Sequence, residues 1–229
     1  MIQLKKTSKR YRQGDREINA LRDVSLHIKR GEFLSIMGPS GSGKSTLLNL
    51  MGGLDQPTSG QVFIDTRPLH GISDDELTLI RRRHVGYIFQ FFNLLPLLTA
   101  AENVGLPLLL EGIPFAQVRP KAVALLEKVG LGQRVEHRPE QLSGGEMQRV
   151  AVARALITNP AVILADEPTG NLDSHTSEEI FLLLKGLNDQ GQTIVMVTHD
   201  SKAAAYGSRI VTLRDGALAE DISLGESDA

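Results

Sequence analysis

The feature that most constrains the fold of this chain is a glycine-rich segment, GPSGSGKST, at residues 38–46. It fits the pattern G-x-x-x-x-G-K-[ST] and directly follows an apolar run, EFLSIM, that is typical of a strand. Gly38, Gly41 and Gly43 let the backbone turn its N–H groups onto phosphates, because no Cβ blocks the approach. A glycine-rich turn without a ligand is the alternative, and the complete pattern in this context argues against it.

The same segment supplies candidate catalytic and metal-binding side chains. Lys44 is expected to reach the β- and γ-phosphates of a nucleotide, and the Ser45 hydroxyl is expected to hold Mg²⁺. The predicted phosphate-binding residues are Gly38, Pro39, Ser40, Gly41, Ser42, Gly43, Lys44, Ser45 and Thr46.

Composition excludes several other kinds of protein. The 229 residues contain 25 basic and 27 acidic side chains, so charge gives no reason to expect nucleic acid as the main partner. Cysteine is absent, which excludes disulfides, cysteine-bound zinc and thiol catalysis. The N-terminus lacks the apolar core of a signal peptide, and Pro96 and Pro107 interrupt the longest apolar stretches. We therefore expect a soluble chain, for which any membrane role requires a partner.

The order of the apolar patterns predicts an α/β core interrupted by a helical lobe. Short runs before residue 38 and at 58–65 read as strands, and 84–90 reads as a strand that ends at Gln90. Residues 91–158 are rich in Leu and Ala with helical spacing. The later runs AVILADE, TIVMVTHD and RIVTL are almost continuously aliphatic, which is typical of buried parallel strands. The tail ISLGESDA is expected to fray.

Two helix starts carry a capping-box pattern, in which a Ser or Thr is followed three residues later by Glu. These are Ser73 with Glu76, before the charged segment that ends in three arginines, and Thr99 with Glu102. The arginine run is expected to be a solvated helix face rather than an anion site.

Polar residues at strand ends form the second group of candidates. Asp166 ends the run VILAD and is the predicted Mg²⁺ carboxylate, while Glu167 is placed to accept a proton from an attacking water. His199 follows another strand and is predicted to contact the γ-phosphate, and Gln90 to touch Mg²⁺ or the water. The alternatives are a salt-bridged strand end for Glu167, a structural histidine and a surface amide.

Two further features of the sequence indicate that the chain binds another molecule. Tyr11 lies 27 residues before Gly38 and could stack on adenine, although a tyrosine in an edge strand is the simpler reading. The segment LSGGEMQRVAVARAL, residues 142–156, begins a helix with Ser143, Gly144 and Gly145, which makes a second anion-binding helix start far from the first.

GPSGSGKST together with LSGGEMQR, ILADEP and VTHD resembles the ATP-binding cassette ATPases over nearly the whole chain. The resemblance implies an α/β P-loop NTPase (RecA-like) core with an N-terminal antiparallel β subdomain and an inserted α-helical subdomain. It implies one nucleotide-binding domain over 1–229, with 1–90 and 159–229 as catalytic core and 91–158 as the helical subdomain that carries the signature motif.

In this family two copies pack head to tail, and the signature segment of one copy caps the ATP held by the other. The resemblance therefore assigns Ser143, Gly144 and Gly145 to the neighbour's nucleotide and gives Asp173, in GNLD, a bridging role between copies. Position 146 is Glu where many members have Gln. Glu146 is counted with the nucleotide-binding residues, and a capping box with Ser143 is its alternative role.

SIMGPSGSGKSTLLN, GGLDQPTSG, FNLLPLLTAAENV and ILADEPTGNLDS resemble one bacterial branch, which includes the lipoprotein-release and macrolide-efflux ATPases. This implies an ATP-hydrolysing subunit on the cytoplasmic face of the bacterial inner membrane, with ATP and Mg²⁺ as cofactors and a second copy and a permease as partners. Docking is expected near 91–104, through Phe91, Phe92, Leu94, Leu95, Leu97 and Leu98. A cell-division regulator, a soluble non-transport ABC ATPase and a P-loop kinase are the alternatives.

Overall fold

The computed structural model describes residues 1–14 and 16–224. Its contacts divide the chain into two compact units, Met1–Arg81 with Lys185–Ala229, and Arg82–Leu184. The predicted helical segment, 91–158, falls within the second unit, which also contains β6 (Val85–Ile88) and β7 (Val162–Asp166). The expected division of a single domain into core and helical subdomain remains a prediction.

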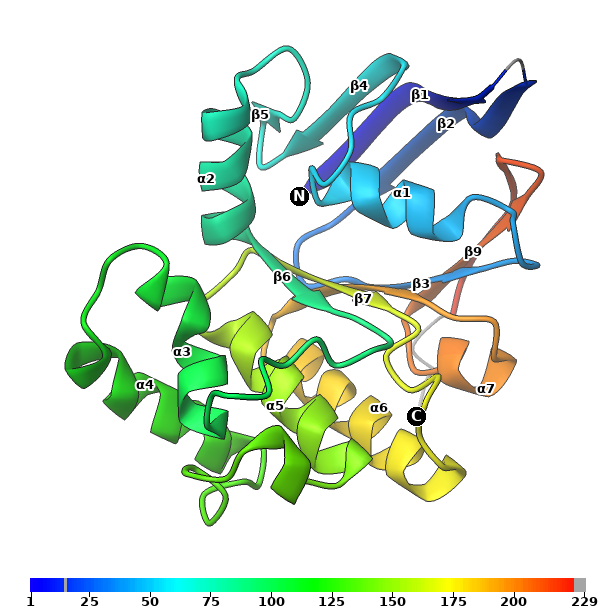
Figure 1. The fold of residues 1–229 in the computed structure, drawn as a ribbon. Helices are drawn as coiled ribbons and strands as arrows, with labels where there is room; N and C mark the ends of the chain where they lie inside the picture. Colours follow the sequence, from blue (N-terminus) through cyan, green and yellow to red (C-terminus); the bar gives the residue numbers. More distant parts are fainter. Residues whose placement is uncertain (15, 225–229) are drawn as a thin grey trace. The chain divides into compact units, whose positions relative to one another are not determined.

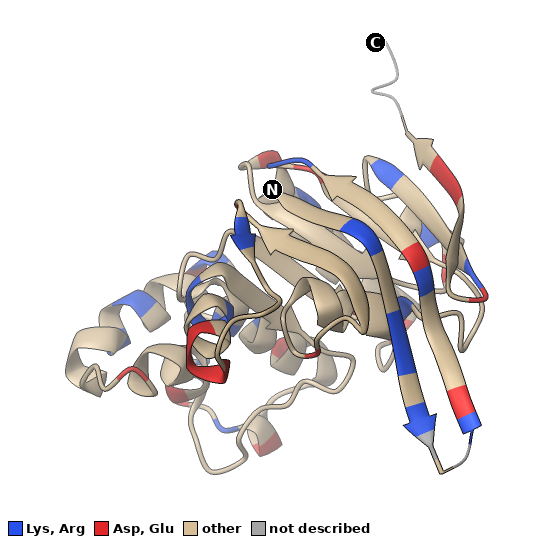
Figure 2. Cartoon of the chain, turned by 90° about the horizontal axis from the view of Figure 1, so that it is seen from above, with Lys and Arg blue, Asp and Glu red and all other residues tan. Residues whose placement is uncertain are grey.

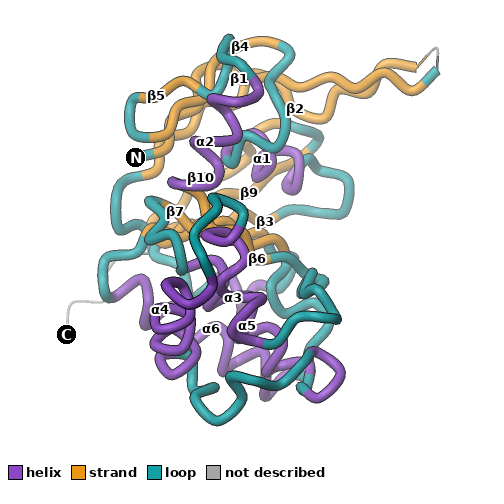
Figure 3. The backbone as a smooth tube through the Cα atoms, turned by 60° about the vertical axis from the view of Figure 1, so that its left-hand side comes forward, coloured by secondary structure: helices purple, strands orange, loops and turns teal. Residues whose placement is uncertain are grey.

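An antiparallel sheet forms one part of the first unit. Its strands β1 (Ile2–Gln13), β2 (Arg16–Ile28), β4 (Ser59–Ile64) and β5 (Arg67–Pro68) lie in the order β2-β1-β4-β5. In β2, buried Leu26 and Ile28 alternate with exposed residues, as expected for a strand with one face against a core. The pairing of β1 with β4 ends at Ser8, so the far end of the β1–β2 hairpin extends past β4 (Figure 3).

A second set of strands, with β3 at its centre, forms the other part of this unit. β3 (Phe33–Met37) runs parallel to both β8 (Thr193–Val197) and β9 (Arg209–Arg214), and β10 (Ala217–Ser223) is antiparallel to β9. Every residue of β8 is buried, which matches the aliphatic run that predicted a parallel strand. Helix α1 (Lys44–Met51) follows β3, and the short helix α7 (Ser201–Ala204) follows β8 (Figure 1).

The second unit packs helices beside a parallel strand pair. β6 pairs with β7, and α3 (Ala100–Leu109), α4 (Phe115–Lys128) and α5 (Gly144–Leu156) pack against one another (Figure 1). A Cβ on Gly86 would lie 2.5 Å from the Ala155 carbonyl oxygen, so this glycine allows β6 to approach α5 closely. A 3₁₀ turn (Pro139–Gln141) precedes α5, and α6 (Ser174–Asp189) begins in this unit.

Both predicted capping boxes are confirmed. Ser73 and Glu76 exchange hydrogen bonds before α2 (Asp74–His84), and Thr99 and Glu102 do so at the start of α3.

Two predictions about where regular structure ends are wrong. β6 ends at Ile88, so Gln90 lies in the following loop rather than at the strand end. The expected fraying of ISLGESDA is wrong for Ile222 and Ser223, which pair with Ile210 and Arg209, because β9 offers a free edge of backbone groups to them. Residues 225–229 lie outside the described residues.

A fully buried asparagine holds the loop that leads into α3. Asn103 Nδ2 donates to the carbonyls of Leu95, Leu98 and Thr99 at 3.0–3.1 Å, and its Oδ1 accepts from Leu95 N at 2.8 Å. One side chain thus bonds four backbone groups at the end of a loop that is without regular structure.

Replacing Asn103 with Ala should therefore destabilise the protein by about 2–4 kcal/mol, because several backbone groups lose their partner at a buried site. Denaturant unfolding measures this change. Gln117→Ala, at an exposed position of α4, is the control and should change the unfolding free energy by less than about 0.5 kcal/mol. Equal stabilities for the two variants would contradict the assigned role of Asn103.

Candidate functional site

The loop between β3 and α1 requires glycine at two positions. Gly38 has φ 147°, and a Cβ there would lie 2.2 Å from the Leu213 carbonyl oxygen. Gly43 has φ 101°, and its Cβ would lie 2.4 Å from the carbonyl oxygen of Ala20. Because backbone atoms cannot yield as side chains do, any larger residue would displace the loop from the strands that hold it.

A buried ammonium group lies inside this loop. Lys44 is 8% exposed, and its Nζ donates to the carbonyls of Gly38 at 2.8 Å and Pro39 at 2.9 Å. Ser42 Oγ is buried and has no hydrogen-bond partner among the described residues. Gly43, the N-cap of α1, provides no side-chain cap for the first turn. A positive charge, an unsatisfied hydroxyl and an uncapped helix start fit a bound phosphate chain.

His199 lies near this loop because β3 and β8 end together. Ile36 is paired with Val197, and Thr198 N donates to the Ile36 carbonyl at 3.1 Å. The loop after β3 and His199 after β8 therefore leave the same edge of the strand pair, where α/β proteins bind ligands. Tyr11 belongs to the same unit, is 38% exposed, and its Oη donates to Asp55 Oδ2 at 2.7 Å.

The second unit brings the other strand-end candidates together in the same way. Ile88 of β6 is paired with Ala165 of β7, so Gln90 and the pair Asp166–Glu167 follow adjacent strand ends. Glu167 has φ 44°, a left-handed backbone conformation that is strained for a residue other than glycine. Such strain is frequent at active sites, where the surrounding structure maintains it.

Gln90 is held from the segment that follows β7. Asn171 Nδ2 donates to the Gln90 carbonyl at 3.0 Å. A Cβ on Gly170 would lie 2.8 Å from Gln90 Nε2, so the amide rests against bare backbone. The loop after β6 and the loop after β7 are therefore joined around Gln90 by direct contacts.

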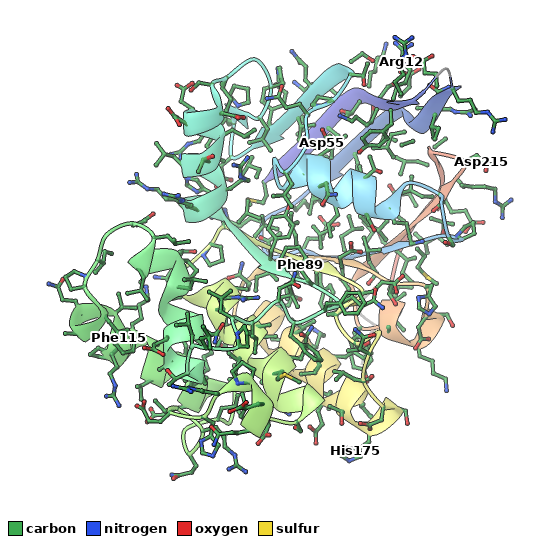
Figure 4. All side chains as sticks on the ribbon, in the orientation of Figure 1. Arg12, Asp55, Phe89, Phe115, His175 and Asp215 are labelled. Carbon is green, nitrogen blue, oxygen red and sulfur yellow. The ribbon has the colours of Figure 1, made fainter. Side chains whose placement is uncertain are left out.

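Helix α5 connects to both loops through two side chains that the sequence analysis did not single out. Gln148, fully buried, donates from Nε2 to the carbonyls of Phe89, labelled in Figure 4, and Pro168. Arg154 donates from Nη2 to the Phe92 carbonyl at 2.8 Å and from Nη1 to the Asn93 carbonyl, and burial lowers its pKa. Arg149 of the same helix bonds Val129 and Glu179 instead, so the residue types alone gave no signal that identified Gln148 and Arg154.

The start of α5 has the geometry of a capping box. Ser143 Oγ accepts from Glu146 N at 3.2 Å, and Ser143 N donates to Glu146 Oε2 at 2.8 Å. The capping role for Glu146 is confirmed, and Arg134 Nε pairs with its Oε1 at 3.1 Å. The hydrogen bond from the Ser143 N–H lowers the pKa of Glu146, and together with a smaller contribution from Arg134 it outweighs the opposing effect of burial.

Close packing surrounds the two glycines of this helix start. A Cβ on Gly145 would lie 2.4 Å from Thr176 Cγ2, and one on Gly144 would lie 3.2 Å from Leu172 Cδ2. Asp173 accepts from Thr176 N at 3.0 Å and from Thr176 Oγ1 at 2.6 Å, which lowers the pKa of its carboxyl. Thr176 therefore bonds Asp173 and also packs against Gly145 of the signature segment.

The parallel strands, the glycine-rich loop and the lysine inside it define a P-loop NTPase fold. A family model described as ABC transporter matches residues 21–170. The chain belongs to this family and is an ATP-binding ABC ATPase. The fold class and the resemblance inferred from the motifs are thereby confirmed, while the roles of individual site residues stay predictions.

Similar proteins cover almost the entire chain. An uncharacterized ABC transporter ATP-binding protein of Methanocaldococcus jannaschii, MJ0796, is 53% identical over 98% of this chain and 97% of its own length. Its dimeric structure in a post-hydrolysis state, bound to ADP and Pi, has a TM-score of 0.90 at 51% identity and covers 98% of this chain and 99% of that one.

Longer proteins contain a similar segment. The macrolide export ATP-binding/permease protein MacB of Bdellovibrio bacteriovorus is 48% identical over 96% of this chain, which spans 34% of its length. Within residues 1–14 and 16–224, no helix has the length and apolar character needed to cross a bilayer.

The depressed pKa of Glu146 generates a test of the cap at the start of α5. The folded state favours the carboxylate, so its stabilisation is present above the unfolded-state pKa of about 4.3 and is lost as pH falls through the lower folded-state pKa. Glu146→Gln preserves an amide oxygen for the cap. The wild type should therefore be more stable than this variant near neutral pH, and the difference should shrink in acid.

Denaturant unfolding at several pH values between about 6 and 3 measures this difference. Glu178→Gln, at an exposed position of α6, serves as the control and should give a difference that does not vary in this way. A constant gap between wild type and Glu146→Gln across the range would contradict the argument.

Proposed function

We propose that this chain works as a head-to-tail homodimer that closes on ATP and powers a membrane export or lipoprotein-release system. The observation that carries the proposal is the likeness to MJ0796, whose post-hydrolysis dimer contains ADP and Pi. In the proposed dimer, each P-loop holds a nucleotide that the α5 start of the other copy caps.

Each residue in the proposed site has one task. The N–H groups of the loop and Lys44 bind the β- and γ-phosphates, while Ser143 and the N–H groups of Gly144 and Gly145 approach the γ-phosphate from the second copy. Closure then depends on ATP, because ADP lacks the charge that the second helix start recognises. Thr176 donates a hydrogen bond to Asp173, and its methyl group packs against Gly145. Asp173 is therefore close to the start of α5, which supports its proposed role between copies.

Mg²⁺ fits the residues of the proposed site. Ser45, Asp166 and Gln90 would hold it with phosphate oxygens, and the ion would supply charge neutralisation. Among the described residues, no cluster of three or more His, Asp or Glu side chains is arranged around a metal position. Magnesium bound jointly by phosphates and a few oxygen ligands does not need such a cluster.

Glu167 acts in this proposal as the base that accepts a proton from the attacking water, and His199 contacts the γ-phosphate. The strained backbone of Glu167 supports this role, since it fixes where the carboxylate points.

Replacing Glu167 with Gln removes the base and preserves the size of the side chain. Hydrolysis should fall by about 10²-fold or more while ATP still binds, and a dimer should accumulate in size-exclusion chromatography with ATP. Lys44→Ala should instead lose nucleotide affinity. Glu178→Gln is the matched control and should hydrolyse ATP at the wild-type rate. Wild-type turnover by Glu167→Gln would make the assignment of the base wrong.

Sharing of sites between copies can be tested by mixing two inactive variants. Ser143→Arg blocks capping of the neighbour's ATP, and Lys44→Ala damages the chain's own loop. One site of the mixed dimer then carries both changes and the other carries neither, so the mixture should recover activity that neither variant has alone. No recovery, despite heterodimers demonstrated by differential tagging, would count against composite sites.

The permease is proposed to bind near residues 91–104, at the cytoplasmic face of the bacterial inner membrane. None of the six large apolar side chains there is buried: Phe91 is 69% exposed and Leu97 80%. Arg154 and Asn103 fix the backbone that presents them. An anchored loop with exposed apolar side chains is typical of an interface. The similarity to MacB, an ATP-binding/permease protein, supports a membrane partner.

Leu95→Asp and Leu97→Asp, tested separately, should disrupt this docking without affecting ATP binding, because both side chains are exposed in the free chain. Co-purification with the membrane subunit from detergent extracts measures the effect. Leu182→Asp places the same charge at an exposed leucine of α6 and should co-purify normally. If both loop variants also co-purify at wild-type levels, this segment is not the docking surface.

A further inference from the structure

The ring of Tyr11 is held by a small network of charged and polar groups. Its Oη donates to Asp55 Oδ2 at 2.7 Å and also shares a hydrogen bond with the Thr46 side chain. The ammonium of Lys9 lies 4.9 Å from the ring centroid and is paired with the Asp55 carboxylate. Lys9 and Tyr11 are two residues apart on β1, so both project from the same face of the strand.

Asp55, labelled in Figure 4, connects this network to the helix that follows the P-loop. It lies in the segment after α1, where the N–H groups of Leu54 and Asp55 donate to the Asn49 carbonyl at 2.9 and 3.4 Å. Thr46 lies in the first turn of the same helix. Both polar contacts of the Tyr11 hydroxyl therefore lead to α1, whose start would bind the phosphates.

The Tyr11 end of the hairpin has little other support from the sheet. The register of β1 with β4 stops at Ser8, and beyond it β1 pairs with β2 alone, in a stretch rich in basic residues (Figures 2 and 3). A two-stranded hairpin is marginally stable by itself. Besides the Asp55 contacts, Arg10 N donates to Thr58 Oγ1 at 3.0 Å. The position of the ring thus depends on contacts with residues 55–58.

The charge state of the network fits this arrangement. Partial burial and then the hydrogen bond to Asp55 raise the pKa of Tyr11, so the phenol stays a donor. Burial acts to raise the pKa of Asp55, but the hydrogen bonds from Lys9 and Tyr11 outweigh it and the pKa is lowered. Lys9 occupies one face of the ring, which leaves the opposite face for a flat aromatic ligand.

We propose that Asp55, with Lys9, is a positioning residue for the nucleotide base: it ties the Tyr11 ring to α1 and so sets where a purine stacks relative to the P-loop. The inference rests on the proposed binding of ATP and on the stacking of Tyr11 on adenine, the interpretation that the sequence offered for this residue. Asp55 does not touch the nucleotide in this scheme and acts only through the tyrosine.

Calorimetric titration of the full chain with ATP and with inorganic tripolyphosphate tests the proposal, because tripolyphosphate has no base. Asp55→Asn should weaken ATP binding about 3- to 10-fold and leave tripolyphosphate binding unchanged. Tyr11→Phe keeps the ring and the Lys9–Asp55 pair but loses the hydroxyl, and should have a similar effect. Asp55→Asn loses the charge that pairs with Lys9 and leaves one oxygen for two donors, whereas Tyr11→Phe loses the hydroxyl itself. Because both changes weaken one network, the loss in the double variant should be smaller than the sum of the two single losses.

Asp65→Asn is the matched control. Asp65 lies in the first unit, as Asp55 does, and pairs with Arg30. Its side chain is 31% exposed, against 28% for that of Asp55. This variant should bind ATP like the wild type.

Two results would overturn the proposal. If both Asp55→Asn and Tyr11→Phe bind ATP with wild-type affinity, the position of the ring does not depend on its hydrogen bond to Asp55. If these variants lose tripolyphosphate affinity as much as ATP affinity, the changes act on the P-loop in general rather than on the base. Tyr11→Ala separates a failure of this inference from a failure of the stacking on which it rests. It should weaken ATP binding more than either variant, and unchanged affinity would show that Tyr11 does not stack on the base at all.

Discussion

The rest of the structure depends on the loop between β3 and α1. Its backbone packs closely against β9 and β2, and it surrounds the buried ammonium group of Lys44. Gly38 and Gly43 lie so close to the carbonyls of Leu213 and Ala20 that neither position can carry a Cβ. The loop carbonyls of Gly38 and Pro39 hold Lys44, which compensates the cost of burying its charge. The N–H groups of the uncapped α1 start are consequently available to an anion, and the proposed binding of the nucleotide phosphates rests on them.

In the second unit, helix α5 is the element on which the arrangement of the loops depends. Its N-terminus presents Ser143 and two glycines, and its body holds the loops after β6 and β7 through Gln148 and Arg154. The segment proposed to meet a permease and the residues proposed to meet ATP are thus attached to one helix. A movement of α5 would be transmitted to Gln90 and to residues 91–93 through these hydrogen bonds, since each connects rigid backbone to a buried or half-buried side chain.

Some of the site could be predicted because its chemistry depends on local order in the chain. The P-loop pattern, the Asp166–Glu167 pair and the capping boxes at Thr99 and Ser143 each act over a few residues, so their spacing alone identifies them. Gln148, Arg154, Asn171 and Asp55 could not be found in this way. Their partners lie 20 to 81 residues away, and no local pattern encodes which carbonyl or hydroxyl such a side chain will reach.

The sequence by itself indicated an α/β core and a phosphate-binding loop, because glycine spacing and apolar periodicity follow directly from backbone geometry. The family was indicated by the resemblance of its motifs to those of the ATP-binding cassette ATPases. Only the tertiary structure decided that Gln90 lies beyond the end of β6, that Arg134 pairs with Glu146, and that the Tyr11 hydroxyl is bonded to Asp55. These outcomes depend on which distant groups packing brings within hydrogen-bond range, and that is a property of the folded chain rather than of any segment of it.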